Sequence, residues 1–242
     1  MLEAQGLTKA YGKQRALEDA SLRVMRGEGV ALLGPNGSGK TTLLCLLAGV
    51  LRASAGRAFV CGQPITEKSA RRGLAFVPQD AAVYDGLTGA ENIALFGRLA
   101  GLRGKALSDG IASALEAAEL SSLRDVRARA YSGGMRRRLS LACALVHSPS
   151  VLLLDEPFEG VDDHSRDHLM QVLVASKRRG VALVLSTHRL NEVSALCERF
   201  CLLREGHIVM QRAIAEPLLE EPLSEPSALA GSRAHATHGA PR

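Results

Sequence analysis

A glycine-rich segment, Gly34–Thr41, constrains the fold of this chain more than any other part of its sequence. It reads Gly-Pro-Asn-Gly-Ser-Gly-Lys-Thr and fits the pattern G-x-x-x-x-G-K-S/T. The apolar run Gly29–Leu33 precedes it, as a buried strand would, and an apolar run from Thr41 to Gly49 follows it, as a helix closed by glycine would. The order of strand, loop and helix predicts an α/β fold.

The same order gives the segment its chemistry. Glycines let the backbone wrap with its N–H groups pointing inward, and the N-terminus of the following helix adds positive potential. Lys40 can then reach the β- and γ-phosphates of a nucleotide, and the hydroxyl of Thr41 can ligate Mg²⁺. We therefore predict that the chain binds ATP together with Mg²⁺.

Acidic residues follow a second predicted strand. Val151–Leu154 is a continuous apolar run, which is typical of a central parallel strand, and Asp155 and Glu156 come directly after it. Asp155 suits the Mg²⁺ shell. Glu156 points the other way, because side chains alternate along a strand, and it could polarise an attacking water as a general base.

Two further polar residues end predicted strands. His188 ends the run 181–188, where it could reach the γ-phosphate or orient the water, and Gln79 follows the run 73–77, where it could ligate Mg²⁺ or sense the γ-phosphate. Each residue alone is compatible with a surface position. Polar groups at several strand ends around one phosphate loop nevertheless predict a hydrolase or a nucleotide-driven switch.

A second candidate anion site lies much later in the chain. Ser132, Gly133 and Gly134 begin a predicted helix and expose backbone N–H groups at its start. The alternative is a plain serine N-cap followed by flexible glycines.

The rest of the sequence predicts strands and helices that alternate along the chain, with one interruption. The block 88–147 is rich in Ala, Leu, Glu and Arg, and predicts helices that form an inserted helical subdomain. The other predicted elements are strands at 2–10, 16–24 and 56–61, helices at 88–100, 105–118, 134–147 and 163–179, a short helix at 191–197, and a hairpin of strands 200–204 and 207–211 around Glu205-Gly206. From Glu216 onward Pro, Ser, Ala and Gly dominate, so we predict that residues 214–242 form a disordered tail.

Composition excludes several classes of protein. The 242 residues carry a net charge of +5 and only 3% aromatic residues without Trp, which argues against a stacking platform for single-stranded nucleic acid. The first residues resemble no signal peptide, and the longest apolar run, Leu43–Leu51, is shorter than a membrane span. An odd count of 5 cysteines in apolar surroundings predicts reduced, buried thiols.

Clusters of His, Cys and Arg allow other interpretations. Cys197, Cys201 and His207 could hold a metal, but packing is favoured, and His164 and His168 favour a solvated helix face over a metal site. Successive residues in the run 136–138 turn by about 100°, so these three arginines do not share a face, and they are expected to be solvated or salt-bridged.

The motifs together resemble the ATPases of ABC transporters over roughly residues 2–213. Gly34–Thr41 resembles their Walker A motif, Val151–Glu156 their Walker B motif with its catalytic glutamate, and Ser132-Gly133-Gly134 their signature motif. The other matches are Gln79 for the Q-loop, Gly160-Val161-Asp162 for the D-loop, His188 for the switch histidine and Tyr11 for the adenine-stacking aromatic.

The resemblance implies a P-loop NTPase (RecA-like) core, an antiparallel β subdomain and a helical subdomain at about 86–148 within an ATPase domain of residues 1–213. It implies a head-to-tail homodimer in which ATP lies between one subunit's phosphate loop and the other's signature helix. Closure and opening of the dimer would drive a separate membrane permease from the cytoplasmic face of the inner membrane, with no nucleic acid as partner.

The implied site residues form three groups. The catalytic candidates are Glu156, His188, Gln79 and Asp162, and the candidate metal ligands are Thr41, Gln79 and Asp155. The candidate nucleotide-binding residues are Tyr11, Gly34, Pro35, Asn36, Gly37, Ser38, Gly39, Lys40, Thr41, Thr42, Ser132, Gly133 and Gly134.

Several departures from the family pattern are informative. Tyr131 stands where leucine is usual and Met135 where glutamine is usual. The methionine variant, with the sequence 87–92, resembles bacterial exporter-type ATPases that have separately encoded permeases. Phe158-Glu159 replaces a small or polar pair, which is expected to tune hydrolysis.

Two alternatives compete with an exporter ATPase. A soluble ABC protein acting on ribosomes or DNA usually holds two ATPase units or a long coiled coil, and the sequence contains neither. A catalytically dead regulator is disfavoured because Lys40, Asp155, Glu156 and His188 are all present.

Overall fold

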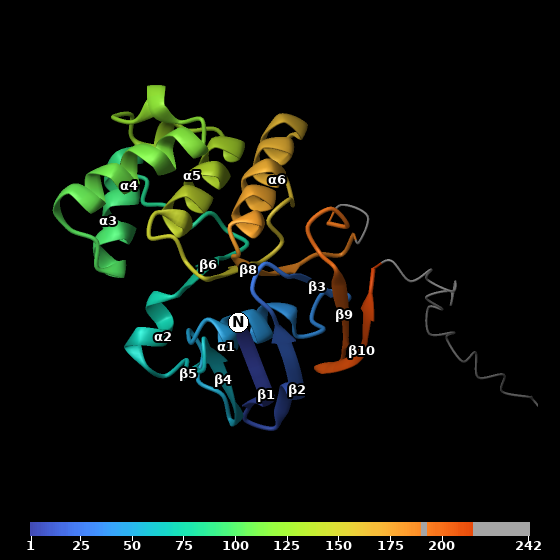
Figure 1. Cartoon of the computed structure of the whole chain (residues 1–242). Coiled ribbons are helices and arrows are strands. Elements are labelled where there is room, and N and C mark those ends of the chain that lie inside the picture. Colours follow the sequence, from blue (N-terminus) through green and yellow to red (C-terminus); the bar gives the residue numbers. More distant parts are fainter. Residues whose placement is uncertain (190–192, 215–242) are drawn as a thin grey trace, which may run out of the picture.

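A six-stranded β-sheet carries most of the predicted motifs just beyond the carboxyl ends of its parallel strands. The structure is a computed structural model that describes residues 1–189 and 193–214 (Figure 1). The strands lie in the order β10-β9-β3-β8-β7-β6, and all neighbours pair in parallel except β10 with β9. Their bounds are β3 Gly29–Leu33, β6 Leu74–Val77, β7 Val151–Leu154, β8 Ala182–Ser186, β9 Arg199–Arg204 and β10 His207–Ala213.

A smaller antiparallel sheet packs against the first helix. Its order is β2-β1-β4-β5, with bounds β1 Leu2–Tyr11, β2 Gln14–Val24, β4 Ala55–Val60 and β5 Gln63–Pro64. Helix α1, Lys40–Leu47, lies between the two sheets (Figure 1). One apolar cluster joins the three layers, because Leu7 of β1, Leu44 of α1 and Val30 of β3 all belong to it.

Three helices are inserted between two strands that are neighbours in the large sheet. Helices α3 Gly89–Ala100, α4 Gly104–Ala117 and α5 Gly133–Leu145 come between β6 and β7 in the chain and form a separate group in Figure 1. Thr88 begins α3 with a capping box to Glu91, and Gly101 ends it at a φ of 105°. Ile93, Leu115 and Leu139 form part of a core that belongs to this group alone.

The second face of the large sheet is covered by α6, Asp163–Arg178, and by part of α5. Leu169 and Leu173 of α6 pack with Leu152 and Leu154 of β7 in this apolar cluster. Helices therefore cover both faces of β7, which explains why its four residues are all buried and all apolar. The chain has the α/β fold of a P-loop NTPase, as predicted.

Several local predictions differ from the structure. The short helix α2, Lys68–Arg72, was not predicted, because its five residues have no side-chain cap. Strand β1 extends to Tyr11, one residue beyond the predicted strand 2–10. Of the predicted helix 191–197, residues 190–192 lie outside the described residues and residues 193–196 form turns. The predicted tail also lies outside the described residues from 215 onward.

Three side-chain predictions were wrong. Arg137, expected to be solvated or salt-bridged, is buried, and its guanidinium donates to the backbone carbonyl oxygens of Pro78 and Glu156. Cys61 is exposed rather than buried, because it lies in the turn between β4 and β5 at a φ of 50°. His168 is buried rather than solvated, and one of its ring nitrogens lies 2.7 Å from the carbonyl oxygen of Ala117, between α6 and the end of α4. Within the described residues, no helix is long and apolar enough to cross a membrane.

Candidate nucleotide-binding site

The phosphate loop connects β3 to α1 and closes on itself. Gly34 has a φ of 147°, and a Cβ atom there would lie 2.3 Å from the carbonyl oxygen of Leu203 and 2.6 Å from Ser38 Oγ. Only glycine fits this position. Gly39 precedes α1 at a φ of 105°, which also requires glycine. The glycines of the motif are therefore fixed by backbone geometry and by close packing.

The C-terminal hairpin braces this loop from outside. Gly206 N donates a hydrogen bond to Ser38 O over 3.1 Å, and Gly34 packs on Leu203 of β9. Glu205 and Gly206 both have a positive φ, 50° and 82°, as the tight turn of a two-residue hairpin requires.

Lys40 lies over the loop with its ammonium group held in place. It is 6% exposed, and Nζ donates to Gly34 O over 2.8 Å and to Pro35 O over 3.2 Å. An ammonium group has three donors, so one remains for a ligand. Beside it, the buried Ser38 Oγ has no hydrogen-bond partner among the described residues. A buried hydroxyl without a partner is costly, and a phosphate oxygen would satisfy it.

The two acids after β7 are held by a serine that sequence reasoning did not assign. Ser186 Oγ, at the end of β8, donates to Asp155 Oδ1 over 2.6 Å and accepts from Glu156 N over 2.8 Å. Glu156 has a φ of 45°, in the left-handed region that a non-glycine residue rarely adopts. The serine thus fixes both acids at an unusual bend of the backbone.

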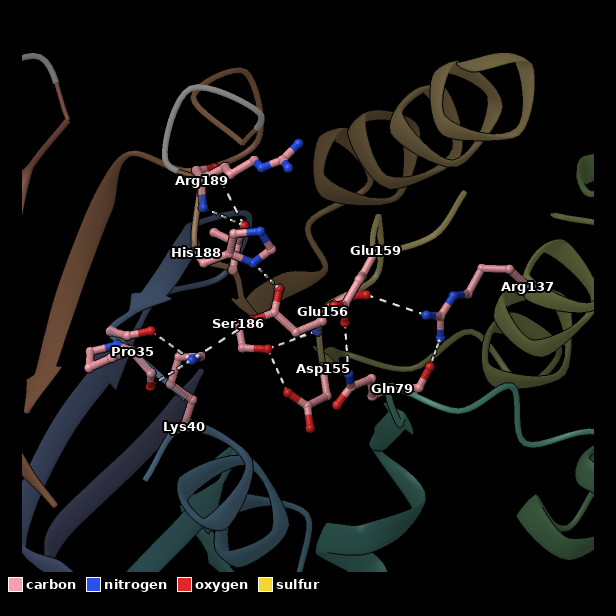
Figure 2. Close-up of polar contacts among 12 residues, drawn as sticks. Pro35, Lys40, Gln79, Arg137, Asp155, Glu156, Glu159, Ser186, His188 and Arg189 are labelled. Carbon is pink, nitrogen blue, oxygen red and sulfur yellow. Dashed lines mark hydrogen bonds and ion pairs between the residues drawn. The ribbon is translucent and has the colours of Figure 1, made fainter. Parts of the chain in front are cut away.

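The Glu156 carboxylate lies between a lysine and a histidine (Figure 2). Its Oε1 is 3.8 Å from Lys40 Nζ, and its Oε2 is 3.4 Å from His188 Nδ1. The Glu156 and Lys40 side chains are largely buried, whereas the His188 side chain is 49% exposed. Lys40, at the buried end of this row of three side chains, lies against the phosphate loop, and His188, at the other end, faces solvent.

A second network surrounds Gln79. Its side-chain Nε2 donates to Glu159 Oε2 over 2.7 Å. The guanidinium of Arg137, from α5, donates to Gln79 O, to Pro78 O over 3.1 Å and to Glu156 O over 3.4 Å (Figure 2). Burial lowers the pKa of Arg137, while the carboxylates of Asp80, Glu159 and Asp155 act in the opposite direction.

A cavity of about 830 Å³ collects most of the predicted residues. Its wall includes Gly34–Thr42, Gln79, Asp155, Glu156 and His188. Within the described part of the chain, the residues lining it do not include five candidates, namely Tyr11, Asp162, Ser132, Gly133 and Gly134. Tyr11 is 52% exposed, with Lys9 Nζ 5.0 Å from its ring centroid.

The start of α5 is capped and open to solvent. Ser132 Oγ accepts from Met135 N over 3.2 Å, so the plain N-cap geometry is present. Ser132 and Gly133 are exposed, whereas a Cβ on Gly134 would lie 2.3 Å from Ser165 Oγ and 2.5 Å from Asp162 Oδ2. This start of α5 therefore leans on the start of α6.

Asp162 is used as the N-cap of α6. Its Oδ1 accepts from Ser165 N over 2.9 Å, and hydrogen bonds from Ser165 hold the pKa of the Asp162 carboxyl below its usual range. Its predicted catalytic role remains a prediction.

Two functional candidates were missed by sequence reasoning, Ser186 and Arg137, whereas Glu159 was noted only as a departure expected to tune hydrolysis. A serine that ends an otherwise apolar strand was a usable signal for Ser186. Arg137 carried no such signal, because its partners lie 58 and 59 residues away for Gln79 and Pro78. The alternative metal sites are not formed: no group of three or more His, Cys, Asp or Glu that could hold a metal occurs among the described residues. Burial raises the pKa values of Cys197 and Cys201 to about 12.

Comparison with known proteins places this site in a family. The family model described as ABC transporter matches residues 17–159. The "Doxorubicin resistance ATP-binding protein DrrA" of Mycobacterium tuberculosis (strain ATCC 25618 / H37Rv) is 41% identical over 210 residues, which cover 85% of this chain and 63% of that protein. "Nod factor export ATP-binding protein I" of Paraburkholderia xenovorans (strain LB400) is 38% identical over 88% of this chain and 70% of its own. The chain thus spans less than two thirds of the length of DrrA.

Solved structures agree with this placement. An "ATP binding subunit of ABC transporter" matches with a TM-score of 0.82 and 28% identity over 88% of this chain and 90% of its own. A dimeric post-hydrolysis state of "the ATP-binding cassette MJ0796 bound to ADP and Pi" matches with a TM-score of 0.80 and 25% identity, covering 89% of this chain and all of that one. The chain therefore belongs to the ABC transporter family and contains the ATP-binding domain of that family.

Proposed function

We propose that this chain is the ATP-hydrolysing subunit of an exporter and powers a separate membrane permease. The observation that carries the proposal is the Glu156 carboxylate, held between Lys40 and His188 at the wall of a cavity formed by the phosphate loop. The similar proteins named for doxorubicin resistance and Nod factor export support the exporter assignment.

The residues of the cavity fit ATP and Mg²⁺. The unpaired Ser38 hydroxyl and the free donor of Lys40 suit phosphate oxygens. Thr41, Gln79 and Asp155 supply the oxygen ligands that Mg²⁺ prefers, with one carboxylate as in many nucleotide sites. When bound, Mg²⁺ neutralises charge on the β- and γ-phosphates.

The protein groups then have separable roles in hydrolysis. Ser186 fixes the backbone of Glu156, and the contacts with Lys40 and His188 hold its carboxylate at the wall of the cavity. Glu156 takes a proton from the attacking water, and His188 stabilises the orientation of that carboxylate. Lys40 stays close to the phosphate loop and balances the charge on the transferred phosphoryl group.

We further propose that the functional unit is a head-to-tail homodimer. A helix start leaves backbone N–H groups without intrahelical partners, and Ser132 and Gly133 are exposed at the start of α5, but these residues do not line the phosphate cavity of their own chain. A second copy is the occupant that such a half-site fits, and the dimeric state of the similar cassette MJ0796 supports this arrangement.

A groove beside β6 is the proposed docking site of the permease. It has a volume of about 620 Å³ and combines basic Arg71 and Arg72 with apolar Phe96 and Leu99. Leu99 is 72% exposed and lines this groove beside Phe96, so the two side chains give the groove an apolar wall. A cytoplasmic segment of a permease with an apolar face and acidic flanks would complement it, and would keep this chain at the cytoplasmic face of the inner membrane.

Glu156→Gln tests the catalytic part of the proposal. The amide keeps the shape of Glu156 but cannot take a proton, so we expect ATP binding to persist and turnover to fall roughly 100-fold or more. ATP should then accumulate a dimer, which light scattering with size exclusion would detect. Glu116→Gln, an exposed change on α4, is the matched control. Unchanged turnover in Glu156→Gln would remove the glutamate from its role.

Pull-down of the tagged chain tests the transport part. We expect a co-encoded polytopic membrane protein to be recovered, and Leu99→Asp to abolish the recovery while ATP binding persists. Full ATPase activity with no membrane partner, or cosedimentation with ribosomes or DNA, would contradict the exporter assignment.

A further inference from the structure

Gln79, which follows β6, is hydrogen-bonded through both its backbone and its side chain. Arg137 binds the carbonyl oxygen of Gln79, and the carboxylate of Glu159 binds its side-chain nitrogen over 2.7 Å. Glu159 is itself anchored, because its N–H donates over 3.2 Å to Glu156 O, the carbonyl that also accepts from Arg137. Gln79 and Glu159 both line the phosphate cavity.

The chemistry of this contact determines which way the amide points. An ionised carboxylate has acceptors only, so it can face the NH₂ group of a glutamine but not the carbonyl oxygen. With the NH₂ group turned to Glu159, the Oε1 atom of Gln79 must take the opposite side of the amide. This orientation of the amide gives a physical reason for a glutamate at a position where the family pattern has a small or polar residue.

We propose that Glu159 is a positioning residue for the ATP site, which orients Gln79 so that its Oε1, rather than its NH₂ group, faces Mg²⁺ and the γ-phosphate. This inference rests on the proposed function, in which Gln79 is a ligand of Mg²⁺. Arg137 supports the arrangement, because it fixes the Gln79 backbone relative to Glu156 and places a positive charge near the Glu159 carboxylate.

A series of substitutions at residue 159 tests the orientation. Glu159→Lys replaces the acceptor with a donor and should turn the NH₂ group toward the metal. Glu159→Gln can present either an acceptor or a donor, so it should fall between Lys and the native residue. Because Glu159 is exposed, all these variants should unfold at nearly the native temperature.

The measurement is the ratio of affinities for a non-hydrolysable ATP analogue with and without Mg²⁺. Because the charge of a new lysine raises both affinities, its general attraction for phosphate cancels in their ratio. We expect Glu159→Lys to lower this ratio roughly tenfold, and Glu159→Gln to lower it less. Glu116→Lys makes the same charge reversal on α4, away from the cavity, and should leave the ratio unchanged.

Combination with Gln79→Ala separates the possible outcomes. If Glu159 acts through Gln79, Glu159→Lys should change the ratio less than about twofold in the Gln79→Ala background. The same tenfold loss in that background would show that Glu159 acts independently and would overturn the inference alone. An unchanged ratio in Gln79→Ala itself would overturn both this inference and the proposed role of Gln79.

Discussion

Two helix N-termini in this chain have the residues to bind phosphate, and they differ in what surrounds them. At α1, the loop 34–40 is closed by Leu203 and Gly206, its lysine is buried, and two acids stand across the cavity. At α5, Ser132 and Gly133 are exposed, and they do not line the cavity that holds Glu156 and His188. The first site is enclosed before any ligand arrives, and the second is only a surface.

The difference indicates how the work is divided. A site that is closed within one chain can bind nucleotide by itself, because its donors are already aimed inward. An open helix start adds charge complementarity only when another molecule carries phosphate to it. Binding should therefore depend on the α1 region, whereas turnover should depend on both regions. The predictions below test this division, from the largest expected effect to the smallest.

Lys40→Ala should remove the first site. The buried ammonium is then lost while the phosphate charge remains, so nucleotide binding or turnover should fall roughly 100-fold or more. Isothermal titration with ATP and a steady-state ATPase assay would measure this. Lys105→Ala, on an exposed lysine of α4 that pairs with Asp109, is the control and should behave as the native chain.

Gly133→Ala should disable the second site without harming the fold. A Cβ at Gly133 meets nothing within 4 Å, and alanine favours the helix, so stability should stay equal or rise by up to about 1 kcal/mol. ATP-dependent dimerisation and turnover should nevertheless fall, because the new methyl group faces the partner. Normal ATP turnover in Gly133→Ala would contradict the claim that turnover depends on the start of α5.

Gly134→Ala is the matched opposite. Its Cβ would lie 2.3 Å from Ser165 Oγ, so α5 or α6 must shift, which should cost about 1–3 kcal/mol of stability. Thermal unfolding of the two variants, measured side by side, distinguishes the exposed glycine from the packed one.

Ser132→Ala compares two helix caps. Ser132 caps α5 and Thr88 caps α3 in the same way, so alanine at either residue should cost about 1 kcal/mol of unfolding free energy. Only Ser132→Ala should also weaken the ATP-induced dimer. If Thr88→Ala weakened it equally, the loss would reflect helix stability rather than a contact with nucleotide.

Tyr11→Ala should have the smallest effect. Loss of stacking on adenine should weaken ATP affinity by about 1 kcal/mol and change turnover at saturation little. Fluorescence titration with ATP and with a triphosphate that lacks a base would separate stacking from phosphate binding. A larger loss for the base-free ligand would contradict the assignment of Tyr11.

Sequence predicted those parts of the site that depend on local patterns. The loop at Gly34, the strand ahead of Asp155 and the cap at Ser132 follow from glycine geometry, apolar runs and N-cap chemistry over a few residues. The roles of Ser186 and Arg137, and the contact of Glu159 with Gln79, escaped prediction because each residue acts on partners at least 19 positions away. His168 was misjudged for the same reason, since the carbonyl that buries it lies 51 positions away on α4.

The contact between the phosphate loop and the turn at Gly206 links two segments that are far apart in the sequence. Any ligand that rigidifies the loop also stabilises the hairpin β9–β10 as part of the sheet, since binding to one ordered state stabilises everything that this state requires. Occupancy of the nucleotide cavity should thus be readable as protease resistance at the far C-terminal end of the domain. Conversely, a chain truncated ahead of β9 should bind nucleotide with lower affinity, although every residue of the glycine-rich motif is intact.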